Sequence, residues 1–186
     1  APYISTYMHV ITGKLAAIVG FNKEIDAEVA KGVAIQVASM NPVAVSASNV
    51  EQSVLDAEFK TAIEKTKDEL VQKEINAALT KAGINPAHVD SEDHMESNMA
   101  KGWITAEDVA RAKEIIAQTT EEKSANLNEA MIQNIAKGRL NKFLKESCLL
   151  SQEYIWDKNL TVAQYLQSVD KDLTIVDMKR FTLKAE

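Results

Sequence analysis

The sequence has few of the residues and runs that are typical of secreted or membrane proteins. Cys148 is the only cysteine in 186 residues, so an intrachain disulfide cannot form and a reducing compartment is expected. Every apolar run is far shorter than the roughly 20 residues that a membrane-spanning helix needs, and no signal peptide is visible. These absences predict a cytoplasmic protein that does not bind membranes.

Positive charge and catalytic motifs are scarce as well. The 21 Lys and Arg are outnumbered by 27 Asp and Glu, giving a net charge of −6. This balance argues against direct nucleic-acid binding, because phosphates are neutralised by clustered Lys and Arg. An acidic surface suits a protein partner with a basic patch. No glycine-rich phosphate loop, G-x-S-x-G stretch or Ser-His-Asp order occurs, so we expect neither an enzyme nor a cofactor.

One acidic segment is the candidate for metal chemistry. It contains His88, Asp90, Glu92, Asp93 and His94. Zinc sites need tighter geometric control and often use cysteine, and this spacing matches no known ligand loop. We interpret the segment as a solvated acidic loop without a metal. A metal-dependent enzyme remains an alternative, which metal analysis of the purified protein would test.

Short strand-like segments lie near both ends of the chain. Tyr3–Met8 and Leu15–Phe21 are apolar runs rich in strand-favouring residues, and the glycine-containing loop between them suits a hairpin. Alternation over Thr174–Leu183 predicts a third strand, with Lys179 and Arg180 on its solvent-facing side. A hairpin alone is marginal in water, so we expect a three-stranded antiparallel sheet.

Apolar residues at helical spacing predict that the middle of the chain is helical. Asp26 is a good N-cap for a first helix, which the Asn-Pro pair at Pro42 ends. A long helix is expected over residues 48–81, with Gly83 just past its end.

Further helices are expected toward the end of the chain. The Thr105–Asp108 sequence resembles a capping box. Another helix should cover residues 128–146, and a threonine can cap a short helix over residues 162–168. The polar stretch 90–101 is expected to be a loop or a helical turn at a tip.

These elements predict an α+β fold with a small three-stranded sheet, packed helices and a long inserted helical hairpin that resembles a coiled coil. We assign residues 1–47 and 147–186 to the core and residues 48–146 to the arm. An isolated arm exposes an apolar stripe, and a two-fold homodimer is the simplest way to cover it. The residues expected at this dimer interface are Phe59, Ile63, Leu70, Met131 and Ile135.

The segment Gly138–Leu150 carries a family resemblance. It reads G-R-L-N-K-F-L-K-E-S-C-L-L, which resembles the pattern G-R-hydrophobic-x-K-F-x-x-E-x-x-L of bacterial translation elongation factor Ts. Gly138 would lie inside a helix, where glycine costs about 1 kcal/mol relative to alanine, so we expect close helix packing or a break there. Lys142 can pair with Glu146 one turn later, and Cys148 is expected to be a buried structural thiol.

Shorter matches to that family occur in the same order along the chain. The segment 7–14, with Tyr-Met-His followed by Gly-Lys, resembles its Y-x-H…G-R/K hairpin, and the segment 34–42, A-I-Q-V-A-S-M-N-P, resembles its I-A-M-H-I-A-A-M-N-P stretch. The segment 161–166, T-V-A-Q-Y-L, resembles its T-V-x-x-x-L, and Arg180-Phe181 matches its closing strand. Together these matches cover both ends of the chain.

The resemblance implies a guanine-nucleotide exchange factor for elongation factor Tu. Such a factor prefers nucleotide-free Tu, and by linkage it lowers the affinity of Tu for nucleotide. The residues that the resemblance places at the Tu contact are Tyr7, Met8, His9, Lys14 and Tyr154.

Three departures from the family pattern limit that implication. The family's T-D-F-V motif and its small N-terminal helical domain are expected upstream of Ala1. Residues 74–128 have no counterpart in the commonest family forms and are interpreted as an insertion that lengthens the arm. The family's Q-P-F is Gln152-Glu153-Tyr154 here.

We therefore expect the chain to be a C-terminal core and dimerisation region that binds Tu but exchanges nucleotide poorly by itself. The alternative from another class is an unrelated dimeric helical scaffold whose arm is its only interaction surface. Co-purification with Tu separates the two.

Overall fold

A computed structural model describes residues 3–8 and 13–183. The chain divides into two compact units: unit 1 is residues 1–56 with 140–186, and unit 2 is residues 57–139. The described residues form six α-helices, a three-stranded sheet and a two-stranded sheet, which confirms the predicted α+β class. No helix in the described ranges has the length and apolar character needed to cross a membrane.

The larger sheet of unit 1 is antiparallel and has the strand order β1-β2-β5. Its strands are β1 (Tyr3–Met8), β2 (Leu15–Phe21) and β5 (Ile175–Thr182), as the sequence predicts. Tyr7 and Arg180 both lie opposite Ala17, whereas Met8 and Phe181 both lie opposite Ala16. Because neighbouring residues of a strand point to opposite faces, these two sets define an inner and an outer face.

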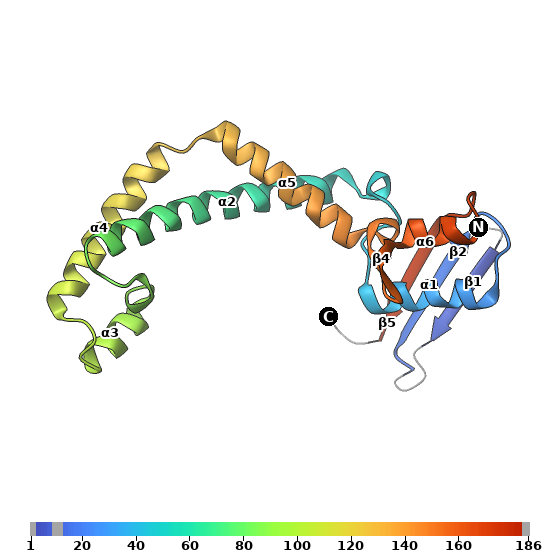
Figure 1. Ribbon diagram of the computed structural model, residues 1–186, viewed down its shortest axis with the longest axis horizontal. Helices are drawn as coiled ribbons and strands as arrows, with labels where there is room; N and C mark the ends of the chain where they lie inside the picture. The colour runs from blue at the N-terminus through green and yellow to red at the C-terminus, as the bar shows by residue number, and fades with distance from the viewer. Residues whose placement is uncertain (1–2, 9–12, 184–186) are drawn as a thin grey trace. The chain divides into compact units, whose positions relative to one another are not determined.

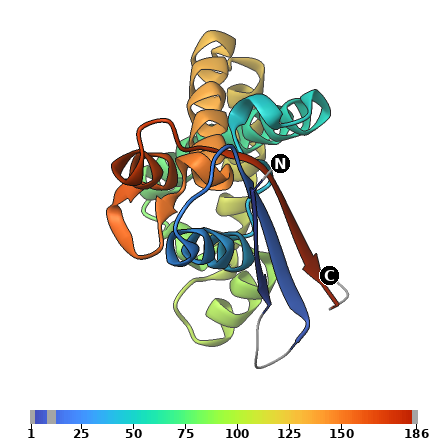
Figure 2. The same ribbon diagram turned by 90° about the vertical axis from the view of Figure 1, so that its right-hand side faces the viewer.

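Helix α1 (Ala27–Met40) covers the inner face of the sheet (Figures 1 and 2). Asp26 caps it, since the Asp26 carboxylate accepts a hydrogen bond from the backbone N–H of Glu28 at 2.8 Å. The helix ends at Asn41, which adopts the left-handed conformation with φ 45° just before a proline. Both ends therefore follow the sequence prediction.

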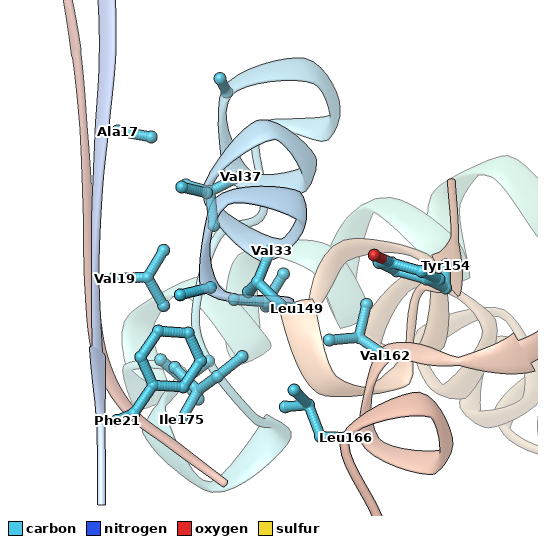
Figure 3. Packing of buried hydrophobic residues seen from close by; sticks show 14 of the residues in the cluster. Ala17, Val19, Phe21, Val33, Val37, Leu149, Tyr154, Val162, Leu166 and Ile175 are labelled. Carbon is cyan, nitrogen blue, oxygen red and sulfur yellow. The ribbon is translucent and has the colours of Figure 1, made fainter. Parts of the chain in front are cut away.

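The core of unit 1 lies between the inner face of the sheet, α1 and the C-terminal segments (Figure 3). Its largest fully buried apolar side chains are Phe21, Leu149, Leu166, Val19, Val33, Val37 and Val162. Cys148 is 1% exposed, and burial raises the pKa of its thiol. The prediction of a buried structural cysteine is confirmed.

The prediction for Arg180 is wrong. Lys179 and Arg180 are adjacent on a strand, so they cannot both lie on its solvent-facing side. Arg180 lies on the inner face and its Nε–H donates to the carbonyl oxygen of Ala38 on α1 at 3.1 Å. The side chain thereby ties strand β5 to the end of the helix.

The C-terminal part of unit 1 contains a second, short hairpin that the sequence analysis did not predict. It is formed by β3 (Glu153–Tyr154) and β4 (Asp157–Thr161). Helix α6 (Val162–Val169) follows directly and begins with a capping box between Thr161 and Gln164. Single turns of 3-10 helix cover Ala47–Asn49 and Leu149–Ser151.

Unit 2 is helical and has its own core. Four helices contribute residues to unit 2: α2 (Gln52–Lys81), α3 (Glu92–Ala100), α4 (Ala106–Ala125) and α5 (Glu129–Ser147). A 3-10 turn covers Pro86–His88. Buried in this core are Ile75, Leu79, Ile84, Val89, Met95, Ile104, Val109 and Ala112.

Helix α3 corrects the expectation of a loop or a single turn over residues 90–101. The Ser91 hydroxyl caps it by accepting from the backbone N–H of His94 at 3.1 Å, and Met95 is buried beneath it. One apolar anchor per turn and a good N-cap are enough for a nine-residue helix in a packed unit, although the segment is mostly polar.

Ion pairs join the helices of unit 2. Lys67 of α2 lies 3.4 Å from Glu129 of α5, and Lys123 of α4 lies 3.6 Å from Glu74 of α2. The Arg139 guanidinium pairs with Glu69, and this contact lowers the pKa of the Glu69 carboxyl.

The helix around Gly138 contradicts both readings of that glycine. Helix α5 runs unbroken through it, and a Cβ added there would have nothing within 4 Å. Neither close packing within the described residues nor a break explains this glycine. The pairing of Lys142 with Glu146 is confirmed at 3.9 Å.

Candidate functional site

The outer face of the three-stranded sheet in unit 1 carries exposed apolar side chains next to the charged Asp177 and Lys179. Among the described residues of this unit no helix covers it (Figure 2). Ile4, Met8 and Phe181 are 64%, 62% and 53% exposed. A hollow of about 140 Å³ lies on this face and is lined by Ile4, Ile18, Gly20, Asp177, Met178 and Lys179. Exposed apolar side chains gathered on one face are typical of a surface that contacts a protein.

Three of the residues predicted to contact Tu, namely Tyr7, Met8 and Lys14, lie at the hairpin end of this sheet. Tyr7 is half-buried on the inner face and packs against the core, whereas Met8 is exposed on the outer face. Lys14 is exposed at the start of β2. His9 lies outside the described residues. Tyr7, Met8 and Lys14 are therefore near one another in the hairpin but do not share one face.

Tyr154 lies far from that hairpin, on the other side of α1 from the strand residues (Figure 3). It is 4% exposed and its ring stacks on that of Tyr165, with centroids 4.0 Å apart and an interplanar angle of 10°. Burial, together with a hydrogen bond to Tyr165, raises the pKa of the Tyr154 hydroxyl far above its usual value. The phenol is therefore neutral at physiological pH.

A buried amide holds the hairpin that carries Tyr154 against α1. The side-chain oxygen of Gln36 accepts the backbone N–H of Ile155 at 2.8 Å, and its nitrogen donates to the carbonyl oxygen of Glu153 at 3.1 Å and to the side-chain oxygen of Gln152 at 3.3 Å. Gln36 is fully buried. Since a buried polar group must be hydrogen-bonded, this amide sets the position of the hairpin.

The five residues predicted for a dimer interface all lie in unit 2, on helices α2 and α5. Met131 is 40% exposed, and the other four, Phe59, Ile63, Leu70 and Ile135, are half-buried. Part of their apolar surface therefore faces solvent in the single chain.

The acidic segment of unit 2 shows no metal-like arrangement in the residues that the structure describes. His94 instead pairs with Asp90 through its Nδ1, and the ring of His88 packs on Trp103 with centroids 5.5 Å apart. These contacts are local, so the geometry gives no support to a metal-dependent enzyme.

Comparison with known proteins gives the family. A model of the family described as Elongation factor TS matches residues 1–185. The chain belongs to the elongation factor Ts family. Relatives with the name Elongation factor Ts include those of Bacteroides fragilis, 61% identical over 183 residues, and Bacteroides thetaiotaomicron, 60% identical over 182 residues; each alignment covers 98% of this chain. A more distant one, from Porphyromonas gingivalis, is 30% identical over 97% of the chain.

The chain spans about half the length of the curated relatives that it matches, 56%, 55% and 45% of the three named above. The match nonetheless runs over nearly the whole chain, residues 74–128 included. Membership of the elongation factor Ts family removes the alternative of an unrelated helical scaffold.

Sequence reasoning missed several residues that stand out in the structure. Gln36 is a fully buried polar residue in an apolar helix, and Trp156 is 65% exposed beside the Tyr154–Tyr165 stack. The alternation of Tyr154 and Trp156 with their neighbours in the segment 153–157 was the available signal.

Proposed function

We propose that this chain is the Tu-binding and pairing part of a guanine-nucleotide exchange factor that acts on elongation factor Tu. The match to the elongation factor Ts family over residues 1–185 carries the proposal. The exposed apolar face of the sheet supports it, because such a face suits a protein partner. Under this proposal the chain works by binding in the cytoplasm and catalyses no covalent chemistry.

We propose that the Tu contact lies at the hairpin end of unit 1 and includes Tyr7, Met8, His9 and Lys14. We propose that Tyr154, on the other side of α1, supports a separate part of the contact through the β3–β4 hairpin. Met8 supports this placement because it is a large apolar side chain left 62% exposed. The 186 residues contain no T-D-F-V stretch, and we propose that the residues that expel GDP are not among them.

A pair of matched substitutions tests the location of the contact. Met8 and Ile4 lie on the same strand and face, with exposed fractions of 62% and 64%. Met8→Asp should weaken binding to purified Tu at least ten-fold, because a charge would be buried against the partner. Ile4→Asp, four residues further from the hairpin turn on the same face, should weaken it less.

Binding is measured by titrating labelled Tu with each variant, after circular dichroism has shown that both variants fold. Equal losses for Met8→Asp and Ile4→Asp would move the contact to the whole outer face. No loss in either variant would remove this face from the proposed interface.

For the arm, we keep the division that the sequence suggests, a core of residues 1–47 and 147–186 and an arm of residues 48–146, with residues 74–128 as its extension. We propose that the arm pairs two chains through Phe59, Ile63, Leu70, Met131 and Ile135. The partial exposure of these side chains supports the proposal, since pairing would remove their apolar surface from water.

Met131→Glu tests the pairing. It places a carboxylate in the proposed interface and should shift the chain from dimer to monomer in sedimentation equilibrium. Ala130→Glu is the matched control, because it adds the same charge at the neighbouring exposed position of α5. A wild-type chain that sediments as a monomer at tens of micromolar would contradict the proposal.

A further inference from the structure

An aromatic pocket lies in unit 1 between α1, the β3–β4 hairpin and α6. Its volume of about 420 Å³ is within the range of small-ligand sites, roughly 300–1,000 Å³. Six side chains that line it carry the argument: Tyr154, Trp156, Tyr165, Glu28, Asp157 and Lys31. The pocket is separate from the outer face of the sheet, because it opens on the opposite side of α1.

Gly32 of α1 lines the pocket and leaves room for the aromatic side chains opposite it. A Cβ built on Gly32 would stand 2.6 Å from the Tyr154 hydroxyl oxygen and 3.6 Å from Nε1 of Trp156. Gly32 itself is buried. Two aromatic side chains therefore reach to the backbone of the helix, and the Gln36 amide fixes the hairpin that presents them.

The charges around the pocket favour a cation. Glu28 and Asp157 bring two carboxylates and Lys31 brings one ammonium group, so the formal charge of the lining is negative. The chain as a whole carries −6. The face of the exposed Trp156 ring attracts cations through its quadrupole, whereas Tyr154 is 4% exposed and has one face stacked on Tyr165. Phosphate-bearing ligands would instead be repelled by the two carboxylates.

We infer that this pocket binds the ammonium or guanidinium group of a Lys or Arg side chain that a protein partner inserts. Trp156, 65% exposed, supplies an open aromatic face beside the pocket, and the carboxylates compensate the charge. A small, open site of this kind suits one side chain from a larger interface. Whichever protein supplies that side chain, the pocket would select it by its positive charge.

Small model compounds test the inference on the intact chain. Nα-acetyl-arginine amide and Nα-acetyl-lysine amide are titrated against nitrogen-15-labelled protein, and the neutral analogue Nα-acetyl-citrulline amide is titrated in parallel. The chain has two tryptophans, so two indole N–H signals are observed, and loss of one in Trp156→Phe assigns them. The Trp156 signal should move with the cationic compounds, and the Trp103 signal of unit 2 should stay.

Three variants test how each charged side chain of the lining affects binding of the cation. Glu28→Gln and Asp157→Asn should each weaken arginine-amide binding about two- to five-fold, and Lys31→Gln should strengthen it by a similar factor, as expected for exposed ion pairs. Asparagine at 157 keeps the oxygen that accepts from the backbone N–H of Asn159 at 3.0 Å. Glu153→Gln is the control, because Glu153 is exposed next to Tyr154 and is not part of the lining.

The outcomes separate cleanly. Weakening by Glu28→Gln and Asp157→Asn with strengthening by Lys31→Gln supports a cation site. Citrulline amide that shifts the Trp156 signal as strongly as arginine amide would overturn the inference, as would a Trp156 signal unmoved by either cation. Equal effects of Glu153→Gln and Glu28→Gln would also overturn it, since they would reflect net charge alone.

Discussion

At the scale of single residues, two helical glycines differ in what surrounds them. Gly32 is buried in α1 beneath the Tyr154 hydroxyl, whereas Gly138 in α5 has open space where a Cβ would be. Glycine in a helix costs about 1 kcal/mol relative to alanine. That cost has a packing reason at Gly32. At Gly138 the described residues offer none.

Gly32→Ala should lower the free energy of unfolding, by about 1–3 kcal/mol, even though alanine favours the helix. The new Cβ would stand 2.6 Å from the Tyr154 hydroxyl oxygen. Tyr154 cannot swing away, because it is 4% exposed and stacked on Tyr165. Urea unfolding monitored by circular dichroism measures the change.

Two variants make this prediction specific. Adding Tyr154→Phe removes the clashing oxygen, so the loss caused by Gly32→Ala should be smaller in that background. Gly138→Ala is the matched control and should raise stability by about 0.5–1 kcal/mol. If Gly32→Ala proves as stable as Gly138→Ala, the contact between Gly32 and Tyr154 is not as close as described.

At the scale of elements, the start of α4 (Ala106–Ala125) is closed by a reciprocal pair of hydrogen bonds. The backbone N–H of Thr105 donates to the Asp108 carboxylate at 3.0 Å, and the backbone N–H of Asp108 donates to the Thr105 hydroxyl at 3.1 Å. The first of these bonds is the main cause that lowers the pKa of Asp108. Folding and ionisation of this carboxyl are therefore linked.

The linkage predicts acid sensitivity in unit 2. The pKa of Asp108 is lower in the folded than in the unfolded chain. The contribution of this carboxylate to the free energy of unfolding is therefore fully present above the unfolded pKa, about 3.9. That contribution is lost as the pH falls through the lower folded value. We follow urea unfolding of unit 2 by Trp103 fluorescence in a Trp156→Phe background. The urea concentration at the midpoint should therefore decrease as the pH is lowered below about 4.

Asp108→Asn should remove part of this pH dependence, whereas Glu107→Gln, which removes a carboxylate outside the capping box, should remove less. Identical pH profiles for Asp108→Asn and the parent chain would show that the capping carboxylate does not contribute.

Elements with strong local signals could be predicted, and elements that depend on packing could not. Residues close together in the sequence determine three of the predicted features: the cap at Asp26, the capping box at Thr105 and the two apolar strands of the hairpin. Helix α3 needed Met95 to be buried against helices from elsewhere in unit 2.

The site was less predictable than the fold. The β3–β4 hairpin is held by Gln36, more than a hundred residues away in sequence. No local pattern carries that contact, so the aromatic pocket was missed. Arg180 was misplaced because charge suggested solvent, whereas its backbone partner is on α1.

At the scale of the whole molecule, each unit has its own core and one of the two tryptophans, Trp156 in unit 1 and Trp103 in unit 2. Proposed roles divide along the chain in the same way, with Tu binding in the core and pairing in the arm. Binding alone does not speed nucleotide release, since a ligand shifts an equilibrium only by its differential affinity for the two states. We therefore propose that the chain binds Tu without speeding the release of GDP.

The most direct test is the release rate of a fluorescent GDP analogue from Tu, measured with the chain alone and with the chain competing against a full-length elongation factor Ts. We expect the chain alone to leave the release rate close to the spontaneous one, and we expect excess chain to slow the release driven by the full-length factor. A release rate with the chain alone that equals the rate with the full-length factor would contradict this proposal, and so would a chain that has no effect in the competition.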